Sequence, residues 1–334
     1  MTFEGTRMTV ETKNHFEISI IIPFCNEVKN IQPLYTKLKD VLDRIGREYE
    51  LIFVDDGSTD GTFLALKGIY DSDPRVRIIQ LRRNFGQTAA LAAGFDHAEG
   101  DIIISMDGDL QHDPAEIPNF LAKIDEGYDI VSGWRKQRVD NLITRKIPSW
   151  MANKLMAILS GVNLHDFGTT YKAYRSDVIK NIQLYGEMHR FVPALASRLG
   201  AKIYEIPIRN VLRESGASHY GLSRTKGVLL DLLVVKFLLS YMTNPMRMFG
   251  SLGLLSFSVG FFTALGLVVW SWLTGLNIMG YHAGLLIFSV LAMLMGVQFI
   301  TMGLLSEMSA RIYQKIDARA VYTLRNAFLH RNNS

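Results

Sequence analysis

Two aspartates separated by one glycine, Asp107 and Asp109, are the residues of this sequence that most directly suggest chemistry. They follow an apolar run at 102–104 and precede Gln111, so three oxygen-bearing side chains alternate along the chain. Alternate side chains of an extended strand point to the same side. Hard oxygen ligands suit Mg²⁺ or Mn²⁺, which keep positions open for phosphate oxygens. A solvated aspartate-rich turn has the same composition, because motifs this short recur by chance, and the surrounding sequence has to separate the two.

Polar residues also follow other apolar runs of strand character, at 17–24, 50–54 and 76–81. Such runs are typical of parallel strands buried on both faces. Stretches with helical spacing come between them, and this alternation predicts an α/β fold with a mostly parallel sheet. In such sheets ligands bind outside the carboxyl ends of the strands. After Pro23, the polar residues at these ends are Asn26, Glu27, Asp55, Asp56, Arg83, Asn84, Asp107 and Asp109.

Beyond residue 132, arginine, lysine, glycine and serine accumulate in three segments, at 133–138, 145–146 and 209–224. A single surface arginine is usually only solvated. Several arginines interleaved with small residues, after an acidic sheet edge, favour loops that bind anions. Asp166 lies among these loops, and its sequence context fits equally a residue that orients a nucleophile and a loop cap.

Composition narrows the class of protein. The 334 residues are 48% hydrophobic, and a single cysteine excludes an internal disulfide framework. A net charge of +4 gives no reason to expect nucleic acid as a partner. Residues 1–16 are polar and lack the apolar core of a secretory signal, so we expect the first domain to stay on the cytoplasmic side.

Two uncharged runs, 248–273 and 283–306, predict a membrane hairpin. Each exceeds the ~18 residues that a spanning helix needs. Arg247 precedes the first run and Arg311 follows the second, while the connector at 274–282 holds no lysine or arginine. The positive-inside rule then places both flanks in the cytoplasm. The alternative is a buried helical hairpin of a soluble protein.

The apolar stretch 227–242 is shorter and carries Asp231 and Lys236, which are costly at mid-membrane. We therefore expect an interfacial helix there. The expected domains are a cytoplasmic catalytic domain (1–225), an interfacial helix (226–246), two transmembrane helices (247–306) and a cytoplasmic juxtamembrane segment (307–334). Small residues in the two spans favour helix association and a homo-oligomer. These residues are Gly253, Gly260, Gly266, Gly296 and Gly303, with Gln298.

These motifs together resemble those of a family 2 glycosyltransferase with a nucleotide-sugar-binding α/β domain. The resemblance is carried by P-F-C-N-E at 23–27, V-D-D-G-S-T-D at 54–60, N-F-G-Q at 84–87 and D-G-D-L-Q at 107–111. The segment from Arg213 to residue 225, followed by two apolar spans, is most similar to the polyprenyl-phosphate sugar transferases. The resemblance covers about residues 16–320 and implies a GT-A-type sheet with flanking helices, interfacial helices and a transmembrane hairpin.

The resemblance also implies a role for each motif. Nucleotide-sugar-binding residues would be Pro23, Asn26, Glu27, Asp55, Asp56, Asn84, Asp107, Gly108, Arg213 and Ser218. A divalent ion, Mg²⁺ or Mn²⁺, would be held by Asp107, Asp109 and Gln111. The phosphate of the acceptor would be bound by Arg135, Arg138, Arg145 and Arg224. The residues expected to act in catalysis are Asp107, Asp109, Asp166 and Arg135.

The implied reaction is inverting transfer of a sugar, with glucose from UDP-glucose expected, to undecaprenyl phosphate at the cytoplasmic face of the inner membrane. Alternatives are mannosyl or aminosugar transfer to the same class of lipid, or a non-catalytic nucleotide-binding membrane scaffold. The implied partners are the UDP-sugar donor, the polyprenyl-phosphate acceptor, membrane lipids, further copies of the chain (a tetramer in relatives) and a flippase for the lipid-linked sugar.

Overall fold

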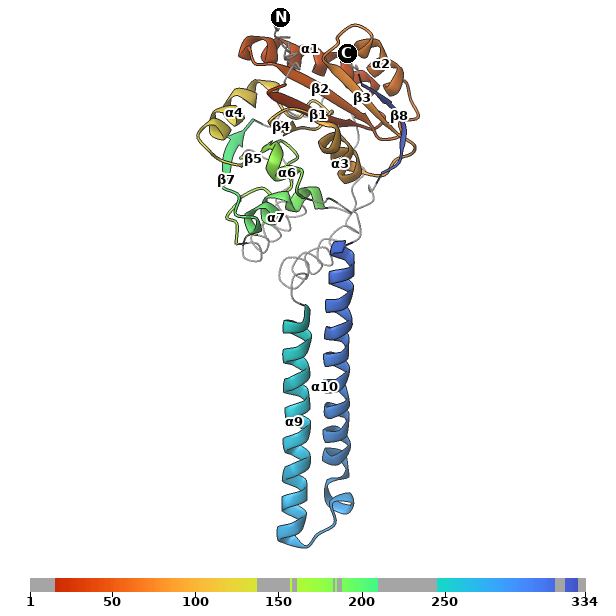
Figure 1. The fold of residues 1–334 in the computed structure, drawn as a ribbon, viewed down its shortest axis with the longest axis vertical. Coiled ribbons are helices and arrows are strands. Elements are labelled where there is room, and N and C mark those ends of the chain that lie inside the picture. Colours follow the sequence, from red (N-terminus) through yellow and green to blue (C-terminus); the bar gives the residue numbers. More distant parts are fainter. Residues whose placement is uncertain are drawn as a thin grey trace, which may run out of the picture. The chain divides into compact units, whose positions relative to one another are not determined.

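The computed structural model describes residues 16–136, 157, 161–182, 184, 188–209, 245–315 and 322–329, and for 310–315 the backbone alone. The chain forms two compact units (Figure 1). One consists of Met1–Val228 together with Arg319–Ser334, and the other of Leu229–Ala318. Two segments far apart in the sequence therefore build one unit. The expected interfacial helix at 226–246 lies outside the described residues, apart from Pro245 and Met246.

A mixed sheet is the core of the first unit, and within the described residues its strands run in the order β7-β5-β6-β4-β1-β2-β3-β8. The strands are β1 Ile18–Phe24, β2 Tyr49–Asp55, β3 Val76–Leu81, β4 Ile102–Ser105, β5 Ile130–Arg135, β6 Lys172–Arg175, β7 Ile203–Ile208 and β8 Leu324–Phe328. Strands β4, β1, β2 and β3 are parallel neighbours, as are β5 and β7. Strands β6 and β8 are antiparallel to their neighbours. The predicted α/β class is confirmed.

Helices cover both faces of this sheet. They are α1 Val28–Ile45, α2 Thr62–Tyr70, α3 Gln87–His97, α4 Ile117–Asp125, α6 Ser176–Ile179 and α7 Val192–Arg198, with 3₁₀ turns η1 Pro114–Glu116 and η3 Met188–Phe191. Alternation along β1 decides the layers, because Ile18, Ile20 and Ile22 pack into the core shared with α1, α2 and α4. Ile21 faces the other way, where a Cβ on Gly94 of α3 would lie only 2.3 Å from its Cγ2. The parallel strands thus lie between two helical layers.

The second unit contains two long helices, α9 Pro245–Thr274 and α10 Ile278–Lys315, the latter kinked at His282. Both are long and apolar enough to cross a membrane. In their most apolar windows only 17% and 11% of the residues are buried, whereas the core helix of a soluble protein is mostly buried. The two helices therefore match the predicted spans better than a soluble hairpin.

Glycines bring α9 and α10 together. A Cβ on Gly253 would lie 2.7 Å from the carbonyl oxygen of Gly296, and one on Gly260 would lie 2.5 Å from that of Ser289. A Cβ on Gly266 would have no such neighbouring atom of α10 within 4 Å. Close backbone approach through small residues is the usual packing of membrane helices. Several of the predicted small residues thus serve contact within the hairpin.

Candidate active site

Asn26 fastens the loop after β1 to the loop after β2. Its backbone has φ 56°, and its side-chain oxygen accepts hydrogen bonds from the N–H of Thr59 (2.8 Å) and of Asp60 (3.4 Å). The Asn26 N–H donates to the hydroxyl of Ser58 at 3.0 Å. Beside it the Glu27 N–H donates to Thr62 Oγ1 at 2.9 Å. The structure therefore gives the Asn26 side chain a role in joining the two loops.

Two buried carboxylates, Asp55 at the end of β2 and Asp56 directly after it, hold the neighbouring loops. Asp55 accepts hydrogen bonds from the Ser58 N–H (3.0 Å) and from the amide of Gln80 on β3 (3.3 Å). Asp56 accepts from the N–H groups of Phe85 (2.7 Å) and Gly86 (3.0 Å). Burial raises the pKa of Asp56 although both N–H groups oppose that shift. The sequence correctly placed both aspartates at the carboxyl edge of the sheet. In the structure they bind the loops at that edge through hydrogen bonds.

Asn84 and Cys25 close the gap between the first and third loops. The Asn84 side-chain N–H donates to Cys25 Sγ at 3.1 Å, and its oxygen accepts from the Gly86 N–H at 3.0 Å. Gly57 lies below them with φ +65°, where a Cβ would lie 2.3 Å from the backbone carbon of Arg83. Only glycine allows this approach. These residues thus form one hydrogen-bonded frame at the ends of β1, β2 and β3.

Asp107, Asp109 and Gln111 lie in a turn, because β4 already ends at Ser105. The strand alternation that suggested a common direction therefore does not apply to them. The turn is fixed by Leu110 at φ 62°, by the Gln111 N–H donating to Asp109 Oδ1 at 3.1 Å, and by the Gln87 amide donating to Asp107 Oδ1 at 2.6 Å. This turn, and not strand alternation, is what keeps the three side chains on one short loop.

Gly108 and His112 support the same turn from beneath. A Cβ on Gly108 would lie 2.6 Å from the Phe24 ring, so the loop can pass over β1 only with glycine there. His112 is buried, and burial lowers the pKa of its ring. Its Nδ1 lies 3.2 Å from the Asp107 N–H and accepts that hydrogen. The aspartate turn is therefore held by contacts that leave its carboxylates at the sheet edge.

The donor set of this turn fits a divalent cation. Mg²⁺ at phosphate sites commonly takes one or two protein carboxylates and completes its shell with phosphate oxygens and water. Asp107 and Asp109 supply two such carboxylates, and neither is buried. Across the part of the chain that the structure describes, no group of three or more His, Cys, Asp and Glu side chains could hold a metal ion. Asp107 and Asp109 would therefore share an ion with phosphate oxygens and water.

Arg135, at the end of β5, forms a two-pronged ion pair with Asp166. Its Nε and Nη2 donate to the two carboxylate oxygens at 2.8 and 3.1 Å. Asp166 is 2% exposed and also accepts from the Gly168 N–H at 3.0 Å. A fork of this kind fixes the plane of the guanidinium as well as its position. Asp166 thus caps its own loop and holds an arginine predicted to meet phosphate.

Lys172 is a residue of this region that the sequence reasoning missed. It is fully buried on β6, and its ammonium donates to the Thr169 carbonyl. Burial lowers its pKa to about 8, while the negative charge of Asp166, and then that of Asp107, acts against the shift. The β4–β6 register pairs Lys172 with Ser105, two residues before Asp107. Its signal was weak, because a lysine in a short polar run reads as solvated.

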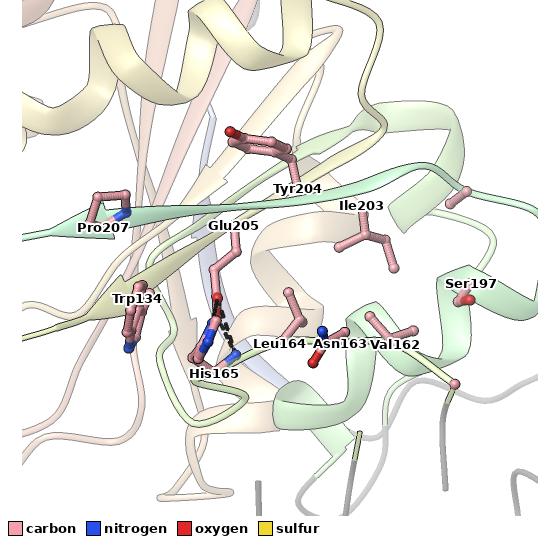
Figure 2. Close-up of a pocket in the computed structure, with 12 residues that line it drawn as sticks. Trp134, Val162, Asn163, Leu164, His165, Ser197, Ile203, Tyr204, Glu205 and Pro207 are labelled. Atoms are coloured by element: carbon pink, nitrogen blue, oxygen red, sulfur yellow. Dashed lines mark hydrogen bonds and ion pairs between the residues drawn. The ribbon is translucent and has the colours of Figure 1, made fainter. Parts of the chain in front are cut away.

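A pocket of about 560 Å³ is lined by Trp134, the residue before Arg135 in the sequence (Figure 2). Its polar side contains Glu205 of β7 and His165, whose Nδ1 lies 2.7 Å from Glu205 Oε2. The His165 ring stacks on Trp134 with centroids 4.2 Å apart and planes 16° apart. Apolar side chains complete the lining, among them Val162, Leu164, Ile203 and Pro207. Sequence reasoning assigned no role to these residues.

Five predicted phosphate-binding residues lie outside the described residues: Arg138, Arg145, Arg213, Ser218 and Arg224. The described part of the site therefore consists of the hydrogen-bonded frame at the ends of β1, β2 and β3, the aspartate turn and the Arg135–Asp166 pair. Pro23, the next-to-last residue of β1, lies next to the turn, its carbonyl oxygen 3.1 Å from where a Gly108 Cβ would be.

Comparison with known proteins gives the family. Residues 19–183 match the family described as Glycosyl transferase family 2. Over 331 residues the chain is 42% identical to the dodecaprenyl-phosphate galacturonate synthase of Rhizobium johnstonii, covering 98% of this chain and 97% of that protein. The chain belongs to glycosyl transferase family 2. It is also 36% identical over 306 residues to the undecaprenyl-phosphate 4-deoxy-4-formamido-L-arabinose transferase of Shewanella sediminis, covering 91% and 90% of the two chains.

Solved structures agree on the fold of this family 2 glycosyltransferase. The glucosyl-3-phosphoglycerate synthase of Mycobacterium tuberculosis, in complex with Mn²⁺, UDP and phosphoglyceric acid, has a TM-score of 0.53 at 18% identity, covering 66% of this chain and 78% of that one. Its complex with Mn²⁺, UDP and glucosyl-3-phosphoglycerate has a TM-score of 0.51 at 17% identity, covering 70% and 86%. The GT-A-like sheet expected from the sequence is confirmed.

Proposed function

We propose that this glycosyltransferase transfers a sugar from a nucleoside diphosphate to the phosphate of a polyprenyl lipid. The observation that carries the proposal is similarity over nearly the whole chain to two proteins named as polyprenyl-phosphate sugar transferases. The two apolar helices support it, since the acceptor is a membrane lipid. The positive charges flanking these helices favour a cytoplasmic active site. The homo-oligomer and the flippase stay predictions.

The sugar is the part of the proposal that changes most from the sequence analysis. Glucose was expected, but the names of both relatives specify other sugars, galacturonate and 4-deoxy-4-formamido-L-arabinose. Since the galacturonate synthase is 42% identical and the arabinose transferase 36%, we take a hexuronic acid such as galacturonate as the first donor sugar to test. Glucose becomes the comparison sugar in the same assay.

The chain's own residues fit this reaction. A divalent ion bound by Asp107 and Asp109 would supply charge neutralisation to the departing diphosphate. The acceptor is an anion that serves as its own nucleophile, because the second pKa of a phosphate monoester is ~6. No strong general base is then required. Arg135, held in plane by Asp166, can pair with that phosphate and offset repulsion between the two anions. A single displacement would invert the anomeric carbon.

The test is a transfer assay with the full-length protein in detergent. The protein is incubated with undecaprenyl phosphate, Mg²⁺ or Mn²⁺, and a panel of nucleotide sugars that includes UDP-galacturonate and UDP-glucose. Mass spectrometry of the lipid fraction should show a lipid-linked hexuronic acid. If the protein binds a nucleotide sugar but transfers none of them, the scaffold alternative gains support. If it neither binds nor transfers any, the proposal is wrong.

Replacing Asp109 by alanine should weaken metal-dependent donor binding by at least ~10-fold, a loss typical of changes around a bound metal. Calorimetric titration of UDP-sugar with and without Mn²⁺ measures the effect. Asp71→Ala is the matched control, because Asp71 is an exposed carboxylate paired with Lys67 on α2. Unchanged, metal-dependent binding in the Asp109 variant would exclude the turn as the metal site.

A further inference from the structure

Glu205 of β7 holds the backbone of two consecutive residues in the loop before β6. Its oxygens accept hydrogen bonds from the His165 N–H (2.9 and 3.1 Å) and from the Asp166 N–H (3.0 Å). Oε2 also lies 2.7 Å from Nδ1 of the His165 ring (Figure 2). The Glu205 side chain is only 10% exposed. A carboxylate at a sheet edge thus grips one short piece of a loop some 40 residues earlier in the sequence.

Glu205 accepts a hydrogen bond from the backbone of Asp166, and the Asp166 side chain pairs with Arg135. The chain of contacts runs from Glu205 through the Asp166 N–H to the Asp166 carboxylate and then to the guanidinium at 2.8 and 3.1 Å. A second route passes through His165, whose ring stacks on Trp134 next to Arg135 in the sequence. Both routes start at Glu205 and end at residues 134–135.

The sheet places Glu205 correctly for this task. In the parallel β5–β7 pair, Ser132 lies opposite Glu205 and Trp134 opposite Pro207. Alternation along β7 turns Ile206 and Ile208 into the core and leaves Glu205 on the other face. Hydrogen bonds to an ionised group are stronger than those between neutral groups. The contacts are therefore suited to holding a loop rigidly.

We propose that Glu205 is a positioning residue for the acceptor subsite: it fixes the 165–166 backbone so that Asp166 presents Arg135 to the acceptor phosphate. This inference rests on the proposed function. Glu205 contacts backbone N–H groups and an imidazole within the protein, so it acts through Arg135. Its effect should appear in the handling of the acceptor and spare the donor, whose frame lies over β1, β2 and β3.

Glu205→Gln is the main variant, because glutamine keeps the size of the side chain and replaces one acceptor oxygen by an amide donor. We expect kcat/KM for polyprenyl phosphate to fall by about 10²-fold, the loss that a 1 Å misplacement can cause. The Kd for UDP with Mn²⁺ should stay within twofold. Hydrogen exchange of a peptide covering 161–170 should quicken. Glu126→Gln is the matched control, since Glu126 is 51% exposed and pairs only at the surface with Lys123.

A double-mutant cycle with Arg135→Lys separates positioning from general support of the fold. If Glu205 works through Arg135, its substitution costs much less in the Arg135→Lys background than in the wild type. If Glu205→Gln lowers kcat/KM by the same factor in both backgrounds, the two residues act independently and the proposal is overturned. An equal loss in donor affinity and acceptor kinetics would also overturn it.

Hydrogen exchange keeps this test separate from the test of the proposed function. If the wild type transfers no sugar to the lipid, the function proposal fails on its own. The positioning of residues 165–166 is then decided by exchange in wild type and Glu205→Gln. Faster exchange confined to 161–170 supports the role of Glu205, and unchanged exchange overturns it.

Discussion

At the scale of single residues, the polar side chains at the strand ends mostly bind other loops of the protein. Asn26 joins residues 58–60 to β1, and Asp56 binds the N–H groups of residues 85 and 86. The frame is therefore assembled before any ligand enters, which lowers the entropy that a ligand must lose on binding. Substitutions in this frame should change donor affinity through loop position.

Gly57→Ala should be strongly destabilising, because it combines a positive φ with a Cβ placed 2.3 Å from the Arg83 backbone. Left-handed backbone and overpacking together cost roughly 2–5 kcal/mol. Gly46→Ala is the control, since Gly46 has φ +70° but nothing within 4 Å of its Cβ, leaving roughly 1–2 kcal/mol of backbone cost. Thermal unfolding of the two variants measures the difference. Equal losses would show that the approach of the two loops is not tight.

The sequence identified the kinds of residue at the site better than their individual tasks. Asp56 and Asp107 were correctly predicted at the carboxyl edge, because the end of a buried strand is visible in hydrophobicity alone. Their partners, residues 85–86 of another loop and Gln87 at the start of α3, are distant in sequence and cannot be identified locally. Lys172 and Glu205 were missed because their own sequence context gives no sign of burial. A charged residue in a short strand looks solvated until its tertiary contacts are known.

At the scale of elements, the buried parallel strands were predictable and the antiparallel ones were not. β1 to β4 coincide with the apolar runs at 17–24, 50–54, 76–81 and 102–104 apart from small differences at the ends. β6 has only four residues and β8 has the polar sequence L-R-N-A-F, so neither shows a clear hydrophobic pattern. β8 depends on its partner: it pairs with β3, and Phe328 packs against Phe63 and Tyr70.

A polar cluster joining α1, β2 and the turn before β3 should make the protein sensitive to acid. A hydrogen bond from Tyr49 and contacts with Lys39 and Arg75 lower the pKa of Asp43 from 3.8 to about 2. Asp73 is buried, which opposes the shift, yet hydrogen bonds from Arg75 and Tyr35 leave its pKa lowered. Between pH ~2 and ~4, both carboxyl groups therefore bind fewer protons in the folded than in the unfolded state. Their stabilisation is therefore complete above pH ~4 and is lost as the pH falls towards 2.

Asp43→Asn should consequently lower the Tm at pH 6 and make its further decline between pH 4 and 2 shallower than in the wild type. Thermal melts of the two proteins in matched buffers give both slopes. Asp71→Asn, at an exposed carboxylate directly after α2, controls for the change of net charge. Identical slopes for wild type and Asp43→Asn would contradict the argument.

At the scale of the whole molecule, the chain combines a nucleotide-sugar-type sheet with an apolar helical hairpin. The hairpin was predictable because uncharged runs of this length are rare outside membranes. Its packing was only partly predictable. Small residues indicated that helices associate, but only the structure shows that Gly253, Gly260 and Gly296 face the partner helix and that Gly266 does not.

Gly260→Leu should separate α9 from α10, because its Cβ would lie 2.5 Å from Ser289 O and 2.8 Å from Met293 N. Overpacking of this kind costs roughly 1–3 kcal/mol. Gly266→Leu, on the same helix but without a close neighbour, should leave the packing intact. Pulsed-EPR distances between one spin label on each helix distinguish the variants. A longer, broader distance distribution is expected for Gly260→Leu only.

The pairing of β8 with β3 has a consequence for how the protein is made. The ribosome synthesises β3 before the hairpin and β8 after it, since α9 and α10 lie between them in the sequence. Nascent domains fold as their segments emerge. The strand that covers this edge of the sheet is thus synthesised after both apolar helices. Until then the edge of β3 is unpaired, a state that invites mispairing with other chains, so the time taken to synthesise the hairpin is also the time for which this edge is exposed.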